Sequence, residues 1–228
     1  MPKRYAAAND EVAALPPDRA AREAERRDHF MYVAAAVFRR HGLSRATMEQ
    51  VAAAAGVTKV VLYRRFPSKD ALIQAIFVET VRRLRAQDAK PWTGYGGGMR
   101  KSLEAARSFE DGFILLVRHG NQHPAYRTHY EALRARVAGR LRGLLWYPGR
   151  PPPRGQRPEL LDLSLEPMIS FCYDCLAYWV ENGDPGKDEQ FLRWHGQMIR
   201  AWRHNAAELL NLDSPEQEWP FDTEGLLP

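Results

Sequence analysis

The residues between Thr47 and Lys69 bring hydroxyl, ammonium and guanidinium groups together at short spacing, and proteins use these groups to bind phosphate. The stretch reads TMEQVAAAAGVTKVVLYRRFPSK and includes a tyrosine, Tyr63, among its basic side chains. Between residues 29 and 69 there are seven Lys or Arg residues and one acidic residue, Glu49. This surplus suits a polyanion, because each neutralised phosphate releases condensed counterions. A solvated helix face has the same composition, so charge alone leaves both interpretations open.

Two other sets of reactive side chains have the wrong setting for catalysis or metal binding. Cys172 and Cys175 form a single pair inside an expected helix, whereas structural zinc needs four ligands and redox pairs usually open a helix. We interpret both as small apolar core residues. His119 and His123 are four residues apart, but a glycine and a proline interrupt the helix between them. With no nucleophile–base pair, paired carboxylates or cofactor loop, the sequence predicts no enzyme, no metal and no cofactor.

Short helices with clear start and stop signals position the phosphate-binding groups. A single apolar stripe predicts a helix from about residue 18 to His41. Thr47 and Gln50 have the spacing of a capping box that opens a second helix. Gly56 lies where a tight turn needs positive φ, and Thr58 caps a third, short helix. The pattern predicts a helix–turn–helix element.

A short helix held at a steep angle to its predecessor fits the major groove of DNA, with its first turn facing base edges and its flanks meeting phosphates. Here the first turn would present Thr58, Lys59 and Val60, with Tyr63 and Arg64 one turn later. The complete set of expected DNA-contacting residues is Arg45, Thr47, Thr58, Lys59, Val60, Val61, Tyr63, Arg64 and Lys69.

Residues 28–75 resemble the DNA-binding domain of the TetR family of bacterial regulators. The resemblance is carried by TMEQVAAAAGVTK at 47–59 and LYRRFPSKDAL at 62–72. It implies phosphate contacts for Thr47, Tyr63 and Lys69. The pair Val60-Val61 departs from the family, where glycine or proline with threonine is common. Two valines favour apolar contact with thymine methyl groups, so we hypothesise that base preference differs here.

The rest of the chain reads as helices, so the expected fold is all-α: an N-terminal three-helix helix–turn–helix domain followed by a helical ligand-binding and dimerisation domain. The expected segments are a flexible arm (1–18), a helix–turn–helix DNA-binding domain (19–70), a helical effector-binding and dimerisation domain (71–212) and a tail (213–228). Residues 91–98 and 148–158 are expected loops, and one helix is expected over about 100–119.

The last two expected helices carry apolar residues on more than one face. The first covers about 166–181, and the second ends at about residue 210. Either both faces are buried within one subunit, or one face packs against a second copy, as the resemblance implies. A two-fold dimer would place two recognition helices about 34 Å apart on a palindrome. The expected interface residues are Met168, Phe171, Cys172, Cys175, Trp179, Phe191, Trp194, Met198 and Trp202.

Aromatic residues in the second domain suggest a cavity for a small apolar or aromatic effector, since tyrosines supply both apolar walls and polar tips. Aromatic residues at helical spacing are more often ordinary core residues, which is the alternative here. The candidates are Phe77, Phe113, Tyr126, Tyr130, Trp146 and Tyr173. The favoured function is a homodimeric repressor that binds double-stranded DNA and is released by the effector; an activator or a partner-binding adaptor on the same fold is the alternative.

No apolar run approaches the roughly 20 residues needed to cross a bilayer, and no secretory signal is evident, so we expect a cytoplasmic protein without membrane contact.

Overall fold

The computed structural model describes residues 17–88, 94–145 and 158–209. Within these ranges the chain is helical with short connections and contains no strand, which confirms the all-α prediction. The chain divides into two compact units, residues 1–76 and 77–228, and the boundary falls inside a continuous helix, α5 (Lys69–Asp88). The expected arm up to residue 16, Trp146, the proline-rich stretch to residue 157 and the tail from 213 lie outside the described residues.

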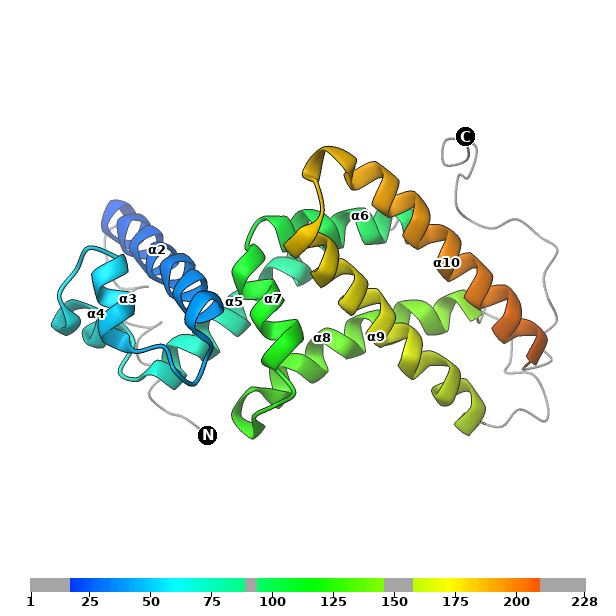
Figure 1. Cartoon of the computed structure of the whole chain (residues 1–228), viewed down its shortest axis with the longest axis horizontal. Helices are drawn as coiled ribbons and strands as arrows, with labels where there is room; N and C mark the ends of the chain where they lie inside the picture. Colours follow the sequence, from blue (N-terminus) through cyan, green and yellow to red (C-terminus); the bar gives the residue numbers. More distant parts are fainter. Residues whose placement is uncertain (1–16, 89–93, 146–157, 210–228) are drawn as a thin grey trace. The chain divides into compact units, whose positions relative to one another are not determined.

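The first unit contains α2 (Pro17–His41), α3 (Met48–Ala54), α4 (Lys59–Arg65) and the beginning of α5, and Figure 1 draws these helices in blue and cyan. The buried stripe of α2 includes Phe30, Ala34 and Phe38, as the periodicity predicts. It faces Met48 and Val51 of α3, while Leu62 and Phe66 bury the inner side of α4. The core therefore holds α3 and α4 by their buried sides, and their opposite sides are exposed to solvent.

The second unit begins differently from the sequence prediction. The expected glycine-rich loop over 91–98 is wrong for its last five residues, because α6 runs from Gly94 to Arg107. Met99 and Leu103 of this helix are buried, and such packing outweighs the cost of about 1 kcal/mol that each helical glycine carries.

The single helix expected over about 100–119 is also wrong, because the chain breaks at Phe109 between α6 and α7 (Glu110–His119). Phe109 has φ −156° and ψ 63°, outside the helical region, and its ring is 2% exposed. Arg83 of α5 stabilises the break: its Nη1 donates to the Ser108 carbonyl at 2.8 Å, and its guanidinium lies 5.2 Å from the centre of the Phe109 ring.

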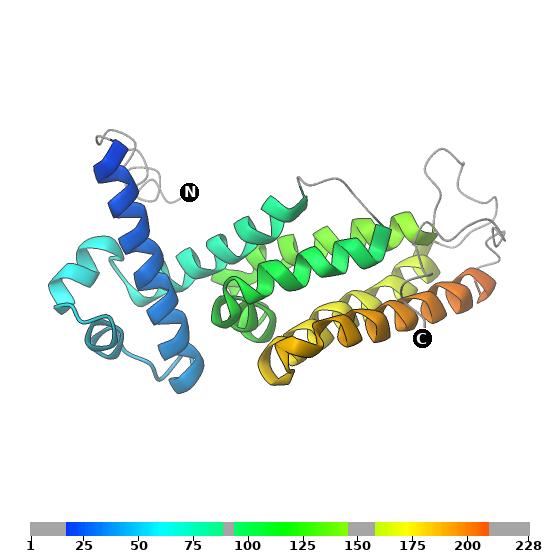
Figure 2. The ribbon, with the colours of Figure 1, turned by 90° about the horizontal axis from the view of Figure 1, so that it is seen from above.

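The remaining helices are α8 (Pro124–Leu145), α9 (Pro158–Asn182) and α10 (Asp188–Leu209), with a 3₁₀ turn η1 (Pro185–Lys187) between the last two. The helix expected from about residue 166 begins eight residues earlier, at Pro158, and runs through Pro167. α9 contacts α6, α7, α8 and α10, so it lies at the centre of the unit; Figure 2 shows α9 and α10 side by side. No helix in the described ranges is both long and apolar enough to cross a bilayer.

Candidate functional site

The start of α3 is fixed by the predicted capping box. The Thr47 amide donates to Gln50 Oε1 at 2.9 Å, and the Gln50 amide donates to Thr47 Oγ1 at 3.2 Å. After α3, Gly56 adopts φ 65°, the left-handed conformation that a side chain would disfavour. The next amide, that of Val57, donates to the Ala52 carbonyl at 3.0 Å and closes the turn. The capping box, the Gly56 conformation and the Val57–Ala52 hydrogen bond therefore set the turn between α3 and α4.

The helix α4 is held from its inner side. Leu62 is fully buried and Phe66 is 1% exposed, and the Arg27 guanidinium of α2 lies 5.1 Å from the centre of the Phe66 ring. Arg65, at the end of α4, forms an ion pair with Glu23 of α2. The sequence prediction counted Arg65 in the basic surplus of the DNA-binding surface, but this guanidinium already has an acidic partner within the unit.

The outer side of α4 carries the residues expected to meet DNA. Val60 is 77% exposed and Tyr63 is 37% exposed, whereas Val61 is half-buried. An apolar contact with a thymine methyl group therefore falls to Val60 more readily than to Val61. Thr58 is exposed and uses its hydroxyl to accept from the Val61 amide at 3.4 Å. The other exposed members of the predicted set are Arg45, Thr47, Lys59 and Arg64.

Lys69 has a role inside the unit that the sequence did not suggest. Its ammonium donates to the carbonyl of Ser44 at 2.9 Å and to the carbonyl of Ala46 at 3.1 Å. These carbonyls belong to the connection that leads into Thr47, so the lysine joins the first residue of α5 to the start of α3. The half-buried Lys69 thus donates to the residue that precedes Thr47, a predicted phosphate contact.

Glu49 and Lys59 form an ion pair that joins α3 to α4 at the exposed surface. The Lys59 ammonium also lies 5.5 Å from the centre of the Tyr63 ring, so a carboxylate and an aromatic face both contact it. The hydrogen bond from Lys59 lowers the pKa of the Glu49 carboxyl and raises the pKa of the Lys59 ammonium, and both groups stay charged at neutral pH. The only sequence signal for this pair was the isolation of Glu49 among basic residues.

Most of the aromatic residues predicted to line an effector cavity pack against one another. Phe77 and Tyr126 meet edge to face at 5.3 Å, and Phe113 lies 6.4 Å from Tyr173. The Tyr173 hydroxyl donates to the Leu133 carbonyl at 2.8 Å, and burial raises the pKa of this phenol to about 12. Tyr130 is half-buried against the Arg134 guanidinium, 5.7 Å from its ring centre. Four of the six predicted residues thus form two separate ring pairs, and the role of the set as a cavity lining stays a prediction.

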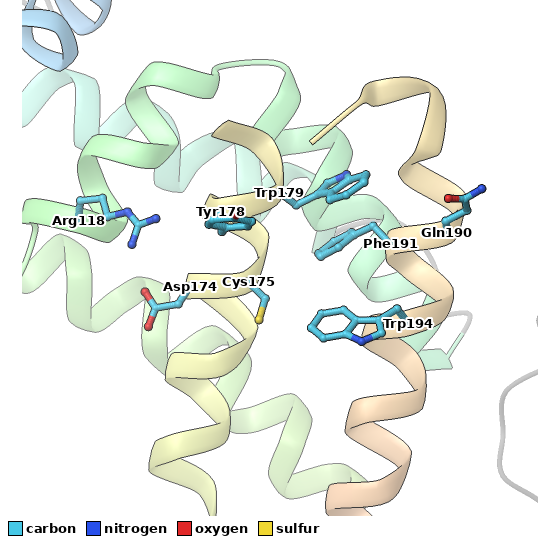
Figure 3. A pocket seen from close by; sticks show the side chains of 8 residues that line it. All are labelled: Arg118, Asp174, Cys175, Tyr178, Trp179, Gln190, Phe191 and Trp194. Atoms are coloured by element: carbon cyan, nitrogen blue, oxygen red, sulfur yellow. The ribbon is translucent and has the colours of Figure 1, made fainter. Parts of the chain in front are cut away.

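A separate groove of about 530 Å³ lies along α9 and α10, with α7 at its edge. In Figure 3 the side chains of Trp179, Phe191 and Trp194 follow one another between the two helices. Trp179 is stacked on Phe191, with ring centres 5.1 Å apart and planes 6° apart, and its Nε1 donates to Asp188 at 2.6 Å. The complete lining is Arg118, Asp174, Cys175, Tyr178, Trp179, Gln190, Phe191 and Trp194.

The residues predicted for a dimer interface differ in exposure within one chain. Trp194 and Met198 are 46% and 42% exposed, and Tyr178, which the prediction omitted, is 62% exposed. Cys172 and Phe191 are buried by the chain itself. The others are half-buried: Met168, Phe171, Cys175, Trp179 and Trp202. One side of α9 and α10 is thus used within the unit, and another side presents aromatic and aliphatic surface to solvent.

These features define a helical protein with a capped helix–turn–helix element in its first unit. Residues 31–76 match the family described as bacterial regulatory proteins, tetR family. The match contains α3, α4 and the start of α5, so the helix–turn–helix element of this chain is similar to that of the tetR family.

Comparisons with individual proteins agree with this placement. An uncharacterised HTH-type transcriptional regulator of Mycobacterium tuberculosis is 37% identical over 59 residues, which are 26% of this chain and 29% of that protein. The match thus spans under a third of this curated relative. A TetR-like transcriptional regulator from Rhodococcus superposes with a TM-score of 0.57 at 16% identity, over 80% of this chain and 96% of that one. A transcriptional regulator from Pseudomonas aeruginosa has a TM-score of 0.56 at 19% identity, over 87% and 97%. At such identities the two structures establish the fold alone.

Proposed function

We propose that the protein is a transcriptional repressor that binds a palindromic DNA site as a homodimer. The observation that carries this proposal is the exposed outer side of α4, where Lys59, Tyr63 and Arg64 project from a helix fixed by its buried side. Arg45 and Thr47 flank it from the start of α3. These groups are hydrogen-bond donors or cations, which suit phosphate oxygens, and they surround an exposed Val60 that suits a base edge.

The proposed dimer uses the exposed side of α9 and α10. Trp194 and Tyr178, which line the groove, and Met198 of α10 are exposed, and clustered apolar surface of this kind marks protein–protein contacts. A two-fold axis through this face would make the same residues of both copies meet, as closed homodimers require. Such a dimer presents two copies of α4, which explains why a palindrome is the expected target.

The proposed release by a small apolar or aromatic ligand depends on α5, which begins in the first unit and continues into the second. Phe77, on the second part of α5, packs edge to face against Tyr126 of α8. A ligand that favours one disposition of α5 over another can shift the population of DNA-competent dimers. The shift is limited by the difference between its affinities for the two states.

Selection of bound sequences from random duplex DNA tests DNA binding and symmetry together. We expect enrichment of a two-fold symmetric consensus, because two identical recognition helices read equivalent half-sites. Tyr63→Phe should weaken binding to every duplex, since the phenol hydroxyl is the proposed phosphate donor, and should leave the consensus unchanged. No enrichment by the wild-type protein would contradict the proposed function, and an asymmetric consensus would contradict the dimer.

A further inference from the structure

Glu49 stands out on the proposed DNA-binding surface because its charge is opposite to that of its surroundings. It is the only acidic residue between positions 29 and 69, where seven basic residues lie. Its carboxylate accepts a hydrogen bond from Lys59, the first residue of α4. The side chains of Glu49 and Lys59 are 57% and 52% exposed, so the pair lies at the surface of the unit and not in its core.

Contacts other than the Glu49–Lys59 ion pair already position α3 and α4. The capping box satisfies the amides of Thr47 and Gln50 at the start of α3, and the buried Leu62 and Phe66 hold the inner side of α4. An ion pair exposed to water contributes little to stability and opens at low cost. Its position, however, is beside Tyr63 and Thr58, where a DNA duplex would lie.

We propose that Glu49 is a specificity-determining residue that acts as an internal counter-ion for Lys59; this inference rests on the proposed DNA-binding function. On DNA of arbitrary sequence, Lys59 must leave the carboxylate to reach a phosphate, so one ionic contact replaces another. At a base edge with paired acceptors, such as guanine O6 and N7, Lys59 gains contacts that Glu49 does not offer. Glu49 therefore weakens binding to arbitrary DNA more than binding to the preferred site.

The salt dependence of binding measures this effect directly. Each phosphate neutralised by the protein contributes about −0.9 to the slope of log K against log salt concentration. In Glu49→Gln, Lys59 is free to neutralise one more phosphate of arbitrary DNA. We expect the slope for a duplex of arbitrary sequence to steepen by about 0.9. For each tenfold dilution of salt, the affinity of the variant should then rise about eightfold more than that of the wild type. The slope for the selected consensus should steepen less, so the ratio of the two affinities should fall.

Two controls separate this pairing from a general change in charge. Glu25→Gln removes the same charge from an exposed position on α2 and should shift the slope far less than Glu49→Gln. In a Lys59→Met background, Glu49→Gln should no longer steepen the slope by one phosphate. Circular dichroism of each variant checks that the helices are intact.

The outcomes are distinct. An equal shift in slope for Glu49→Gln and Glu25→Gln would overturn the inference, because net charge would then explain the result. An equal gain in affinity for the consensus and for arbitrary DNA would overturn the role in specificity. If the wild-type protein binds a consensus normally in either case, the proposed function stands; if it binds no DNA, both fail together.

Discussion

At the scale of single residues, polar side chains in the first unit serve its internal structure as well as its surface. Lys69 was predicted as a phosphate contact from its place in the motif, and its ammonium is bonded to the Ser44 and Ala46 carbonyls. A motif identifies which side chain is present at a position, but the acceptors that this chain reaches lie 23 and 25 residues earlier in the sequence. The internal contact could not be predicted from the motif.

Lys69→Met should lower both stability and DNA affinity. The variant keeps an unbranched side chain but leaves two carbonyls without their charged donor, and hydrogen bonds to charged groups contribute about 1–3 kcal/mol. The free energy of unfolding from urea titration should fall by about that amount. The control is Arg64→Met, an exposed side chain, which should flatten the salt slope without lowering stability. Unchanged stability in Lys69→Met would mean that the ammonium serves DNA alone.

His195 makes the second unit sensitive to mild acid. It is fully buried, and burial lowers its pKa from 6.5 to about 4. Because the unfolded chain takes up a proton at higher pH than the folded one, stability is complete above pH 6.5 and falls as the pH drops towards 4. The loss should reach about 3 kcal/mol. His129, whose pKa burial also lowers, adds to it with the same sign.

Urea titrations at several pH values between 7 and 4 would measure this loss, since the expected change is about 1.4 kcal/mol for each pH unit over most of the window. His195→Gln has no titrating ring and should flatten most of the dependence. If the variant and the wild type lose stability equally, another group is responsible.

At the scale of elements, local signals predicted the first unit well and the second unit less well. Thr47 and Thr58 cap amides three positions away, Gly56 has the positive φ of the turn, and the caps and turn form where the sequence predicts them. The break between α6 and α7 depends instead on Arg83 of α5, which is 25 residues from Ser108. Periodicity carries no information about such a contact. The pairing of α8 arginines with α9, such as Arg134 with Ser170, is equally non-local.

The break at Phe109 gives a testable consequence for α7. A Cβ atom at Gly112 would lie 2.4 Å from the Phe109 ring, which is buried and has little room to move. Gly112→Ala should therefore destabilise the protein by about 1–3 kcal/mol through overpacking. At Gly139 of α8 a Cβ atom meets nothing within 4 Å, so Gly139→Ala should be neutral or stabilise by up to about 1 kcal/mol. Equal stability of the two variants in urea titration would show that the ring moves aside.

At the scale of the whole molecule, the charge and the apolar surface are on different units. The excess of positive charge could be assigned from the sequence, with 13 basic and 8 acidic residues up to position 70 and 20 of each after it. The apolar face of α9 and α10 was harder to define. Periodicity shows that a helix has two apolar sides, but which side its own chain covers depends on the packing of α9 against four other helices. Tyr178 was missed for this reason.

Trp194→Ala combined with Met198→Glu should convert the protein to monomers in sedimentation experiments. The double variant removes an exposed indole and adds a charge to the apolar face, and desolvating an unpaired charge is costly. Val78→Glu is the control for an added surface charge, because Val78 is 48% exposed and belongs to α5, not to α9 or α10. The monomer should bind the selected consensus more weakly than the control. A wild-type protein that is itself monomeric would contradict the proposed dimer.

The stacking of Trp179 on Phe191 has a further consequence. Two of the six tryptophans of the chain, Trp179 and Trp194, line the groove of α9 and α10. Indole fluorescence shifts to shorter wavelength when water leaves the ring, and a hydrogen-bonded neighbour such as Asp188, 2.6 Å from Trp179 Nε1, affects its intensity. The groove therefore contains an intrinsic optical reporter, and its occupancy can be followed by emission spectra without a label.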